Sequence, residues 1–331
     1  MAKKTEIYWI TLLQAIGIII VVIYHIQLID KATGANHTFC SMISHPLIPI
    51  MMPLIFFISG GLLYISRIQN KYSIFALYKD KFIRLLLPFA FFVTFYFLLK
   101  AALNGLVKTP VDISINFYIE SFYLFYKHPS GHLWYLATLM TLMLFYPVYV
   151  FACRNKFAMF SLLAFAFIMY YCDLHVFFTH NYFNLANLNK YFIYFYLGIV
   201  FFRYKIYQYL NNAVCCIILP LAYVCLLYFK VDLITSVVGI FAATSLAITL
   251  CKSKRFSLSI IGNHIYQIYL LSFAFQAMVE LLLWKRLFYN EDLFYLFYVI
   301  NLLSGLFLPI AVVMIVKKCP YRFVRLCFGL K

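Results

Sequence analysis

Apolar runs of about 20 residues recur along this whole sequence and are separated by short polar segments. A helix needs about 20 apolar residues to cross the roughly 30 Å hydrocarbon core of a bilayer. Hydrophobic residues make up 66% of the 331 residues and charged residues only 11%, so a soluble fold could not hide the apolar surface. The sequence therefore predicts an all-α integral membrane protein.

The apolar runs predict about ten transmembrane helices. The expected spans are residues 8–29, 47–66, 82–103, 131–152, 156–172, 189–203, 213–229, 232–251, 258–284 and 293–316. No internal repeat of 20–50 residues and no Pro-rich or Ser-rich linker divides them. We therefore expect a single transmembrane domain over residues 1–331.

The basic residues favour one orientation of these helices. With a cytoplasmic N-terminus, 19 of the 27 Lys and Arg residues fall on the inner side and 8 on the outer side. Eight of the ten acidic residues then fall outside. Because cytoplasmic loops are rich in Lys and Arg, this distribution predicts that both termini are cytoplasmic.

The net charge of +17 does not indicate a nucleic acid partner, because the basic residues are scattered between apolar segments. A metal ion is not expected either. His128 and His132 are four residues apart, but the Pro-Ser-Gly sequence at 129–131 interrupts any helix between them. The lipid bilayer is the partner that composition alone predicts.

The first span holds two polar residues that are costly in lipid, Gln14 and His25. Eleven residues turn a helix by about 1100°, close to three full turns, so both side chains should lie on one face. Imidazole titrates near neutral pH and suits a general base. The alternative is an interfacial histidine that only forms a hydrogen bond with a loop.

The second span carries Ser59, Gly60 and Gly61, and such small residues allow a neighbouring backbone to approach closely. The loop that follows is the most basic part of the chain, with Arg67, Lys71, Lys79, Lys81 and Arg84. The positive-inside rule explains the excess of charge. It does not explain why Lys81 and Arg84, neighbours on a helix, continue to the membrane boundary.

Four segments together resemble the acyltransferase type 3 family. They are residues 21–25 (Val-Val-Ile-Tyr-His), residues 52–60, the Lys81-x-x-Arg84 pair before Leu87-Pro88, and residues 132–136 (His-Leu-Trp-Tyr-Leu). Residues 261–270 resemble a late helix of the family more weakly. The four segments occur in the family's order and within the expected topology.

The resemblance implies a ten-helix enzyme of the bacterial cytoplasmic (inner) membrane. Such enzymes transfer an acyl group, usually acetyl, from cytoplasmic acyl-CoA to hydroxyls of surface polysaccharides, lipopolysaccharide or lipid-linked glycans. The donor substrate would be acetyl-CoA or another acyl-CoA, without a metal. The outer segments 104–130 and 173–188, rich in Tyr and Phe, would contribute to the choice of acceptor.

The resemblance also assigns expected roles to residues. His25 matches the family's essential histidine, as a base or an acyl relay, and Gln14 stands where the family has arginine, which makes it a candidate catalytic residue. The phosphates of CoA would bind Lys81, Arg84 and Arg67. The substrate path would be lined by Ser59, His132 and Trp134.

Two other functions fit the same pattern of helices. A glycan or lipid exporter would have polar crevices and an outer vestibule but would need no pair of CoA-binding cations. A non-catalytic paralogue would bind glycan or partner enzymes only, and Gln14 in place of the family's arginine would then indicate that catalytic activity has been lost. Direct transfer and acyl relay through His25 are also both open. Binding of acyl-CoA separates the enzyme from the other two functions.

Overall fold

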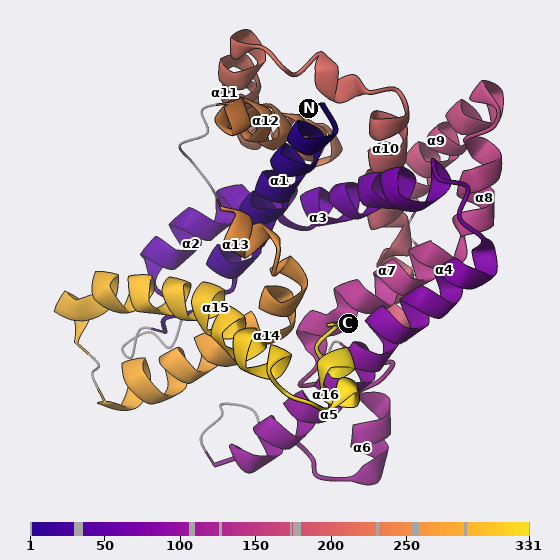
Figure 1. Cartoon of the computed structure of the whole chain (residues 1–331). Helices are drawn as coiled ribbons and strands as arrows, with labels where there is room; N and C mark the ends of the chain where they lie inside the picture. The colour runs from indigo at the N-terminus through magenta and orange to yellow at the C-terminus, as the bar shows by residue number, and fades with distance from the viewer. Residues whose placement is uncertain are drawn as a thin grey trace. The chain divides into compact units, whose positions relative to one another are not determined.

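The computed structural model describes residues 2–29, 36–105, 110–125, 128–172, 174, 180–229, 232–252, 258–287 and 290–330. Helix accounts for 82% of the structure, and the described residues contain no strand, so the all-α prediction is confirmed. The chain forms two compact units (Figure 1). Unit 1 comprises Met1–Tyr64 and Tyr194–Ile310, and unit 2 comprises Ile65–Ile193 and Ala311–Lys331. A single transmembrane domain over residues 1–331 stays a prediction.

Unit 1 is built around its first helix, α1 (Ala2–Tyr24). This helix packs against α2 (Thr38–Ser44), α3 (Ile48–Leu63), α12 (Asp232–Lys252), α13 (Ser259–Gly262) and α14 (Ile265–Met278). The unit also contains α11 (Ala213–Phe229), which packs on α12, a π-helical segment at Val279–Leu287, and most of α15 (Phe294–Lys317). The α1 side chains Leu13 and Ile18 are each 1% exposed, so α1 lies in the core of the unit.

Helix α3 meets the C-terminal part of α10 (Leu188–Arg203) at glycine contacts. A methyl group on Gly60 would collide with the carbonyl oxygen of Phe195, and one on Gly198 would collide with that of Phe57. Neither helix could approach this closely with a larger residue at these positions. The predicted close approach at Gly60 is confirmed.

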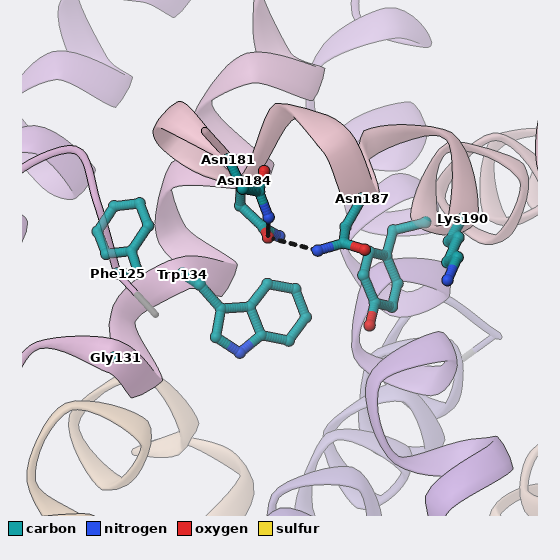
Figure 2. Close-up of a pocket in the computed structure, with 8 residues that line it drawn as sticks. Phe125, Gly131, Trp134, Asn181, Asn184, Asn187 and Lys190 are labelled. Carbon is teal, nitrogen blue, oxygen red and sulfur yellow. Dashed lines mark hydrogen bonds between the residues drawn. The ribbon is translucent and has the colours of Figure 1, made fainter. Parts of the chain in front are cut away.

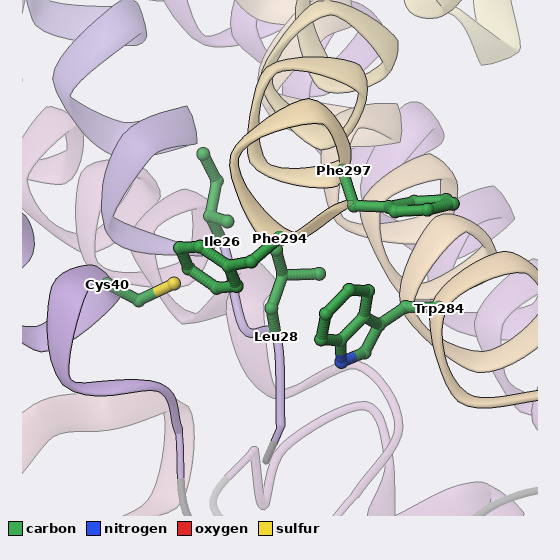
Figure 3. Packing of buried hydrophobic residues seen from close by; sticks show 6 residues of the cluster. All are labelled: Ile26, Leu28, Cys40, Trp284, Phe294 and Phe297. Atoms are coloured by element: carbon green, nitrogen blue, oxygen red, sulfur yellow. The ribbon is translucent and has the colours of Figure 1, made fainter. Parts of the chain in front are cut away.

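An apolar cluster fixes the chain just beyond the end of α1 (Figure 3). Ile26 and Leu28, which are 1% and 0% exposed, pack with Cys40 of α2 and with Trp284 of the π-helical segment. Phe294 and Phe297 of α15 complete the cluster. The Trp284 indole N–H also donates to the carbonyl oxygen of Ile29 at 2.9 Å. This packing holds the residues that directly follow His25.

Unit 2 contains shorter helices. They are α4 (Ile74–Lys81), a π-helical segment at Phe82–Leu86, α5 (Leu87–Ala102), α6 (Ile115–Glu120), α7 (Trp134–Leu144), α8 (Tyr146–Ala152), α9 (Lys156–Tyr171), a 3₁₀ segment at Tyr182–Asn187 and α16 (Arg322–Cys327). The Tyr78 hydroxyl donates to the carbonyl oxygen of Leu144, and the Tyr146 hydroxyl to that of Tyr72, both at 2.8 Å. These two bonds connect the α4 region with the α7–α8 corner.

Among the residues that the structure describes, six helices are long and apolar enough to cross a membrane. They are Thr38–Ile68, Ile74–Ala102, Tyr182–Arg203, Asp232–Lys252, Ile265–Leu287 and Glu291–Lys317. The other four predicted spans fall on shorter apolar helices, at Tyr8–Tyr24, Lys156–Tyr171 and Ala213–Phe229, and on a pair bent by 52°, Gly131–Leu144 with Tyr146–Ala152. The bend coincides with Pro147, which cannot donate a helical hydrogen bond. The count of ten spans and the orientation stay predictions.

Candidate functional site

His25 directly follows the last turn of α1, and the helix itself orients its ring. Nδ1 lies 2.7 Å from the carbonyl oxygen of Val21, one turn earlier. Because a carbonyl oxygen only accepts hydrogen bonds, Nδ1 carries the proton of the neutral imidazole and Nε2 keeps its lone pair. The ring also packs edge-on against Phe273 of α14, with ring centroids 6.1 Å apart. Nε2 can therefore accept a proton or attack a carbonyl carbon.

Two buried amides lie beside the end of α1. Gln276 Nε2 donates to the carbonyl oxygen of Val22 at 2.9 Å, and Asn301 Nδ2 donates to that of Gln276 at 3.3 Å. These side chains are 2% and 0% exposed, and their Oε1 and Oδ1 atoms accept no hydrogen bond from any described residue. Neither residue is among those predicted from the sequence. The signal that could have found them is a polar residue inside an apolar helix, the same criterion that singled out His25.

Gln14 lies on α1 together with His25, as the helical spacing predicts, and its side chain is half-buried. Ile18 and Val21, between them, are buried at 1% and 4% exposure. Within the described part of the chain the Gln14 amide forms no hydrogen bond with His25 or with any other residue. A direct catalytic role for Gln14 stays a prediction.

In unit 2 the structure brings Arg67 and Arg84 to one carboxylate, Asp80. Arg67 donates to Asp80 Oδ2 at 2.6 Å, and Arg84 Nε donates to Asp80 Oδ1 at 3.0 Å. The Arg67 guanidinium also lies 3.9 Å from the ring centre of Tyr72. Asp80 is not among the residues predicted from the sequence, although its i,i+4 spacing to Arg84 is a signal for an ion pair on a helix.

Lys81 is the neighbour of Asp80 in the chain and completes the basic cluster, which we define as Arg67, Asp80, Lys81 and Arg84. Three cations and one carboxylate leave this cluster a net charge of +2. The Arg84 side chain is 38% exposed and the Arg67 side chain 18%, so Arg84 is the more accessible of the two arginines. Neither terminal amino group of Arg84 donates to another described residue, so both are available to an anion such as a phosphate.

Both arginines lie on π-helical turns. Arg67 lies in the segment Tyr64–Ile68, which continues α3, and Arg84 lies in Phe82–Leu86, between α4 and α5. Such turns are rare and often occur at functional sites, because the extra residue redirects the side chains around it. Their occurrence at two arginines that share one carboxylate supports a binding role for the basic cluster.

The three residues expected along a substrate path have different surroundings. Ser59 is half-buried in α3, and its hydroxyl donates to the carbonyl oxygen of Ile55 at 2.8 Å. The His132 ring packs edge-on against Tyr96 with centroids 4.2 Å apart. Trp134 begins α7 and lines a pocket of about 460 Å³ within unit 2.

This pocket combines amides, aromatic rings and one cation (Figure 2). Asn184 and Asn187 come from the 3₁₀ segment, Asn181 directly precedes it, and Lys190 comes from the first turn of α10. Further lining comes from the rings of Phe125, Trp134 and Tyr191 and from Gly131. Residues 106–109, 126–127, 173 and 175–179 of the outer segments predicted to choose the acceptor lie outside the described residues.

The turn that carries Phe125 and Gly131 is organised by His128. Its side chain is 3% exposed, its Nδ1 lies 3.1 Å from the Ser121 hydroxyl, and its Nε2 lies 3.6 Å from a Glu120 carboxylate oxygen. Burial lowers the pKa of His128 below the usual 6.5, and the Glu120 charge partly opposes that shift. The imidazole is therefore stable in its neutral form at neutral pH.

The described residues contain no group of three or more His, Cys, Asp or Glu side chains placed to hold a metal ion. The predicted residues divide between the units. Unit 1 holds Gln14, His25 and Ser59, and unit 2 holds Arg67, Lys81, Arg84, His132 and Trp134. Within unit 2 Arg67 and Arg84 share Asp80, and Lys81 is the next residue in the chain; a common phosphate-binding role of the three cations stays a prediction.

Comparison with known families gives one finding. A family model described as "Acyltransferase domain" matches residues 7–317 of the 331. No curated protein and no solved structure shows significant similarity to the chain.

Proposed function

Because the chain belongs to the acyltransferase domain family, we propose that it is an integral membrane O-acyltransferase. It would transfer an acyl group, with acetyl as the first candidate, from cytoplasmic acyl-CoA to a hydroxyl of a surface polysaccharide or its lipid-linked precursor. We place it in the bacterial inner membrane, as one domain with about ten spans and both termini cytoplasmic. The basic loops and the apolar helices support this placement.

The observation that carries the proposal is the hydrogen bond from His25 Nδ1 to Val21. It leaves the Nε2 lone pair available for acyl transfer. In direct transfer, Nε2 takes the proton of the acceptor hydroxyl while the hydroxyl oxygen attacks the thioester carbonyl. The tetrahedral intermediate then expels the CoA thiolate, which takes the proton from His25, so one C–O bond replaces one C–S bond.

In the relay, Nε2 attacks the thioester itself and forms an acyl-histidine with release of CoA thiolate. The acceptor hydroxyl oxygen then attacks the acyl carbon, the C–N bond to His25 breaks, and the hydroxyl proton passes to the CoA thiolate, which regenerates neutral His25. Incubation with labelled acyl-CoA in the absence of acceptor separates the routes, because only the relay leaves label on His25.

The donor would be held by the basic cluster. CoA carries several phosphate groups, and Arg84 offers them two unused terminal amino groups beside the Lys81 ammonium. Arg67 and Asp80 would keep Arg84 in place through the shared carboxylate. The net charge of +2 supports binding of an anion rather than of a neutral solute.

The test is His25→Ala, assayed for transfer of labelled acetyl from acetyl-CoA to glycan in membranes. We expect loss of roughly two to four orders of magnitude in rate, the usual contribution of a base or nucleophile. Protein abundance should stay unchanged, because the half-buried ring contributes little packing. The control is His45→Ala, an exposed histidine of the same unit. Wild-type transfer by His25→Ala would refute the mechanism, and absence of acyl-CoA binding to wild-type protein would favour an exporter or a non-catalytic paralogue.

A further inference from the structure

We propose that the pocket of unit 2 lined by Trp134 and Asn187 binds a sugar ring that carries an anionic group. The inference rests on the proposed function, since it identifies the class of acceptor that a glycan acyltransferase would take. It draws on four features of the described residues: the pocket itself, a network of amides around the buried Asn184, a strained backbone and an uncompensated charge.

The amides form one connected network centred on Asn184, which is 7% exposed. Asn184 Oδ1 accepts hydrogen bonds from Asn181 Nδ2 at 3.0 Å and from Asn187 Nδ2 at 2.8 Å (dashed lines in Figure 2). Asn184 Nδ2 donates to the Thr138 hydroxyl at 2.9 Å, and that hydroxyl donates to the carbonyl oxygen of Trp134 at 3.0 Å. Asn184 thus orients the other two amides and is a positioning residue.

The backbone around Asn184 is held in an unfavourable conformation. Phe183 has φ 50° and Asn184 has φ 60°, both in the left-handed region. Asparagine adopts this region readily, but phenylalanine does so at an energetic cost. The Phe183 amide donates to the carbonyl oxygen of Tyr123 at 2.8 Å, which helps to hold the turn. Phe183 is 48% exposed, so burial of its own ring does not offset the energetic cost of this backbone conformation. The conformation instead directs the Asn184 side chain inward.

The aromatic lining supplies a face for a sugar ring. The rings of Trp134 and Tyr191 lie 5.0 Å apart with an interplanar angle of 35°. The C–H face of a pyranose packs on such rings, while its hydroxyls need both donors and acceptors, which amides provide together. A volume of about 460 Å³ falls within the range of small-molecule sites.

The charge of the pocket limits the chemical class of the ligand further. Lys190 is exposed, forms no ion pair with a described residue and is the single charged side chain among the described residues that line the pocket, so this lining carries a charge of +1 without a carboxylate. A neutral sugar would leave this charge unused. A carboxylate or a phosphate on the sugar would compensate it. The ligand class is therefore an acidic sugar unit, a uronate or a sugar phosphate.

The experiment measures equilibrium binding to purified full-length protein in detergent with three probes: methyl glucuronide, methyl glucoside and glucose 1-phosphate. We expect the two anionic probes to bind roughly tenfold or more tightly than the neutral glucoside, the effect of one charge-assisted contact. The relative affinities of the glucuronide and the phosphate decide between the two anion sources. Equal affinity for all three probes would overturn the assignment of an acidic ligand.

Two variants and one control complete the test. Lys190→Gln should remove the preference for anionic probes but keep binding of the glucoside, whereas Trp134→Ala should weaken all three probes by roughly two- to tenfold. The control is Lys156→Gln, which removes an exposed lysine of the same unit outside the pocket and should change nothing. A preference retained in Lys190→Gln would refute the role of this lysine and with it the proposal.

Acyl-CoA binding measured on the same preparations separates this inference from the proposed function. Acyl-CoA binding and His25-dependent transfer without any binding of the probes would overturn the pocket inference alone. Selective binding of the anionic probes without binding of acyl-CoA would support the pocket and overturn the proposed acyltransferase.

Discussion

Substitution of the two arginines that share Asp80 should separate donor binding from stability. Arg84 is 38% exposed and bonds Asp80 through Nε at 3.0 Å, with its terminal amino groups unused by described residues. Arg67 is 18% exposed, bonds Asp80 at 2.6 Å and lies over the Tyr72 ring. Arg84→Ala should therefore weaken binding of acyl-CoA, whereas Arg67→Ala should mainly destabilise the fold.

The contacts set the expected magnitudes. Arg84→Ala removes an i,i+4 ion pair that is more than one-third exposed, worth roughly 0.3–0.5 kcal/mol. It also removes a charge-assisted contact to a CoA phosphate, worth roughly 1.5–3 kcal/mol or about ten- to a hundredfold in affinity. Arg67→Ala removes a less exposed charge-assisted bond, roughly 1.5–3 kcal/mol, and a cation–π contact, roughly 0.5–1 kcal/mol. Its cost in free energy of unfolding is on the order of 2–4 kcal/mol.

The assay combines calorimetric titration of acetyl-CoA with thermal unfolding, both on purified protein in one detergent. Lys79→Ala is the matched control, because it removes an exposed positive charge from the same basic loop without touching Asp80. We expect Lys79→Ala to change affinity less than threefold, because solvent screens the exposed charge of Lys79. Wild-type acetyl-CoA affinity in folded Arg84→Ala would refute the binding role, and an unchanged melting temperature in Arg67→Ala would refute the structural one.

Three further outcomes follow from the structure. Gly60→Val should lower protein abundance in membranes, measured by blot, because the added carbons would collide with Phe195; normal abundance would contradict the close helix contact. Binding of methyl glucuronide should weaken as the pH falls from about 7 to about 5. The pKa of His128 is lowered in the folded turn, so the unfolded turn binds more protons below pH 6.5. The folded turn, and with it the pocket, therefore loses stability as the pH decreases through this range. Glucuronide affinity that does not change with pH would exclude this linkage. A reporter fused after Thr38 should report the outer side, and a cytoplasmic signal would break the predicted topology.

The helical architecture could be predicted from the sequence because it depends on the length and polarity of single segments. The apolar runs predicted an all-α structure, and Gly60 predicted a close helix contact. Periodicity could not give the bend at Pro147 or the π-helical turns, since both are local departures from the regular helix.

The candidate sites were predicted only in part. The spacing of Lys81 and Arg84 on a helix predicted both residues. Asp80 was not predicted, because a single carboxylate in a basic loop is typical of ordinary surface charge. The outer segment was expected to use Tyr and Phe, whereas Asn181, Asn184 and Asn187 form the network. Their convergence depends on left-handed backbone at two successive residues, which no propensity or periodicity specifies.

The π-helical turn at Phe82–Leu86 has a consequence for how this chain can vary. A π-helical turn is an α-helix with one residue too many, so removal of a single residue would restore regular helix. Everything beyond the deletion would then rotate by about 100° and move by about 1.5 Å along the axis. Deletion of Ile83 would keep every charge of the basic cluster yet place the arginine three residues from Asp80 instead of four. The number of residues in this turn, as well as their chemistry, therefore determines which way the arginine points.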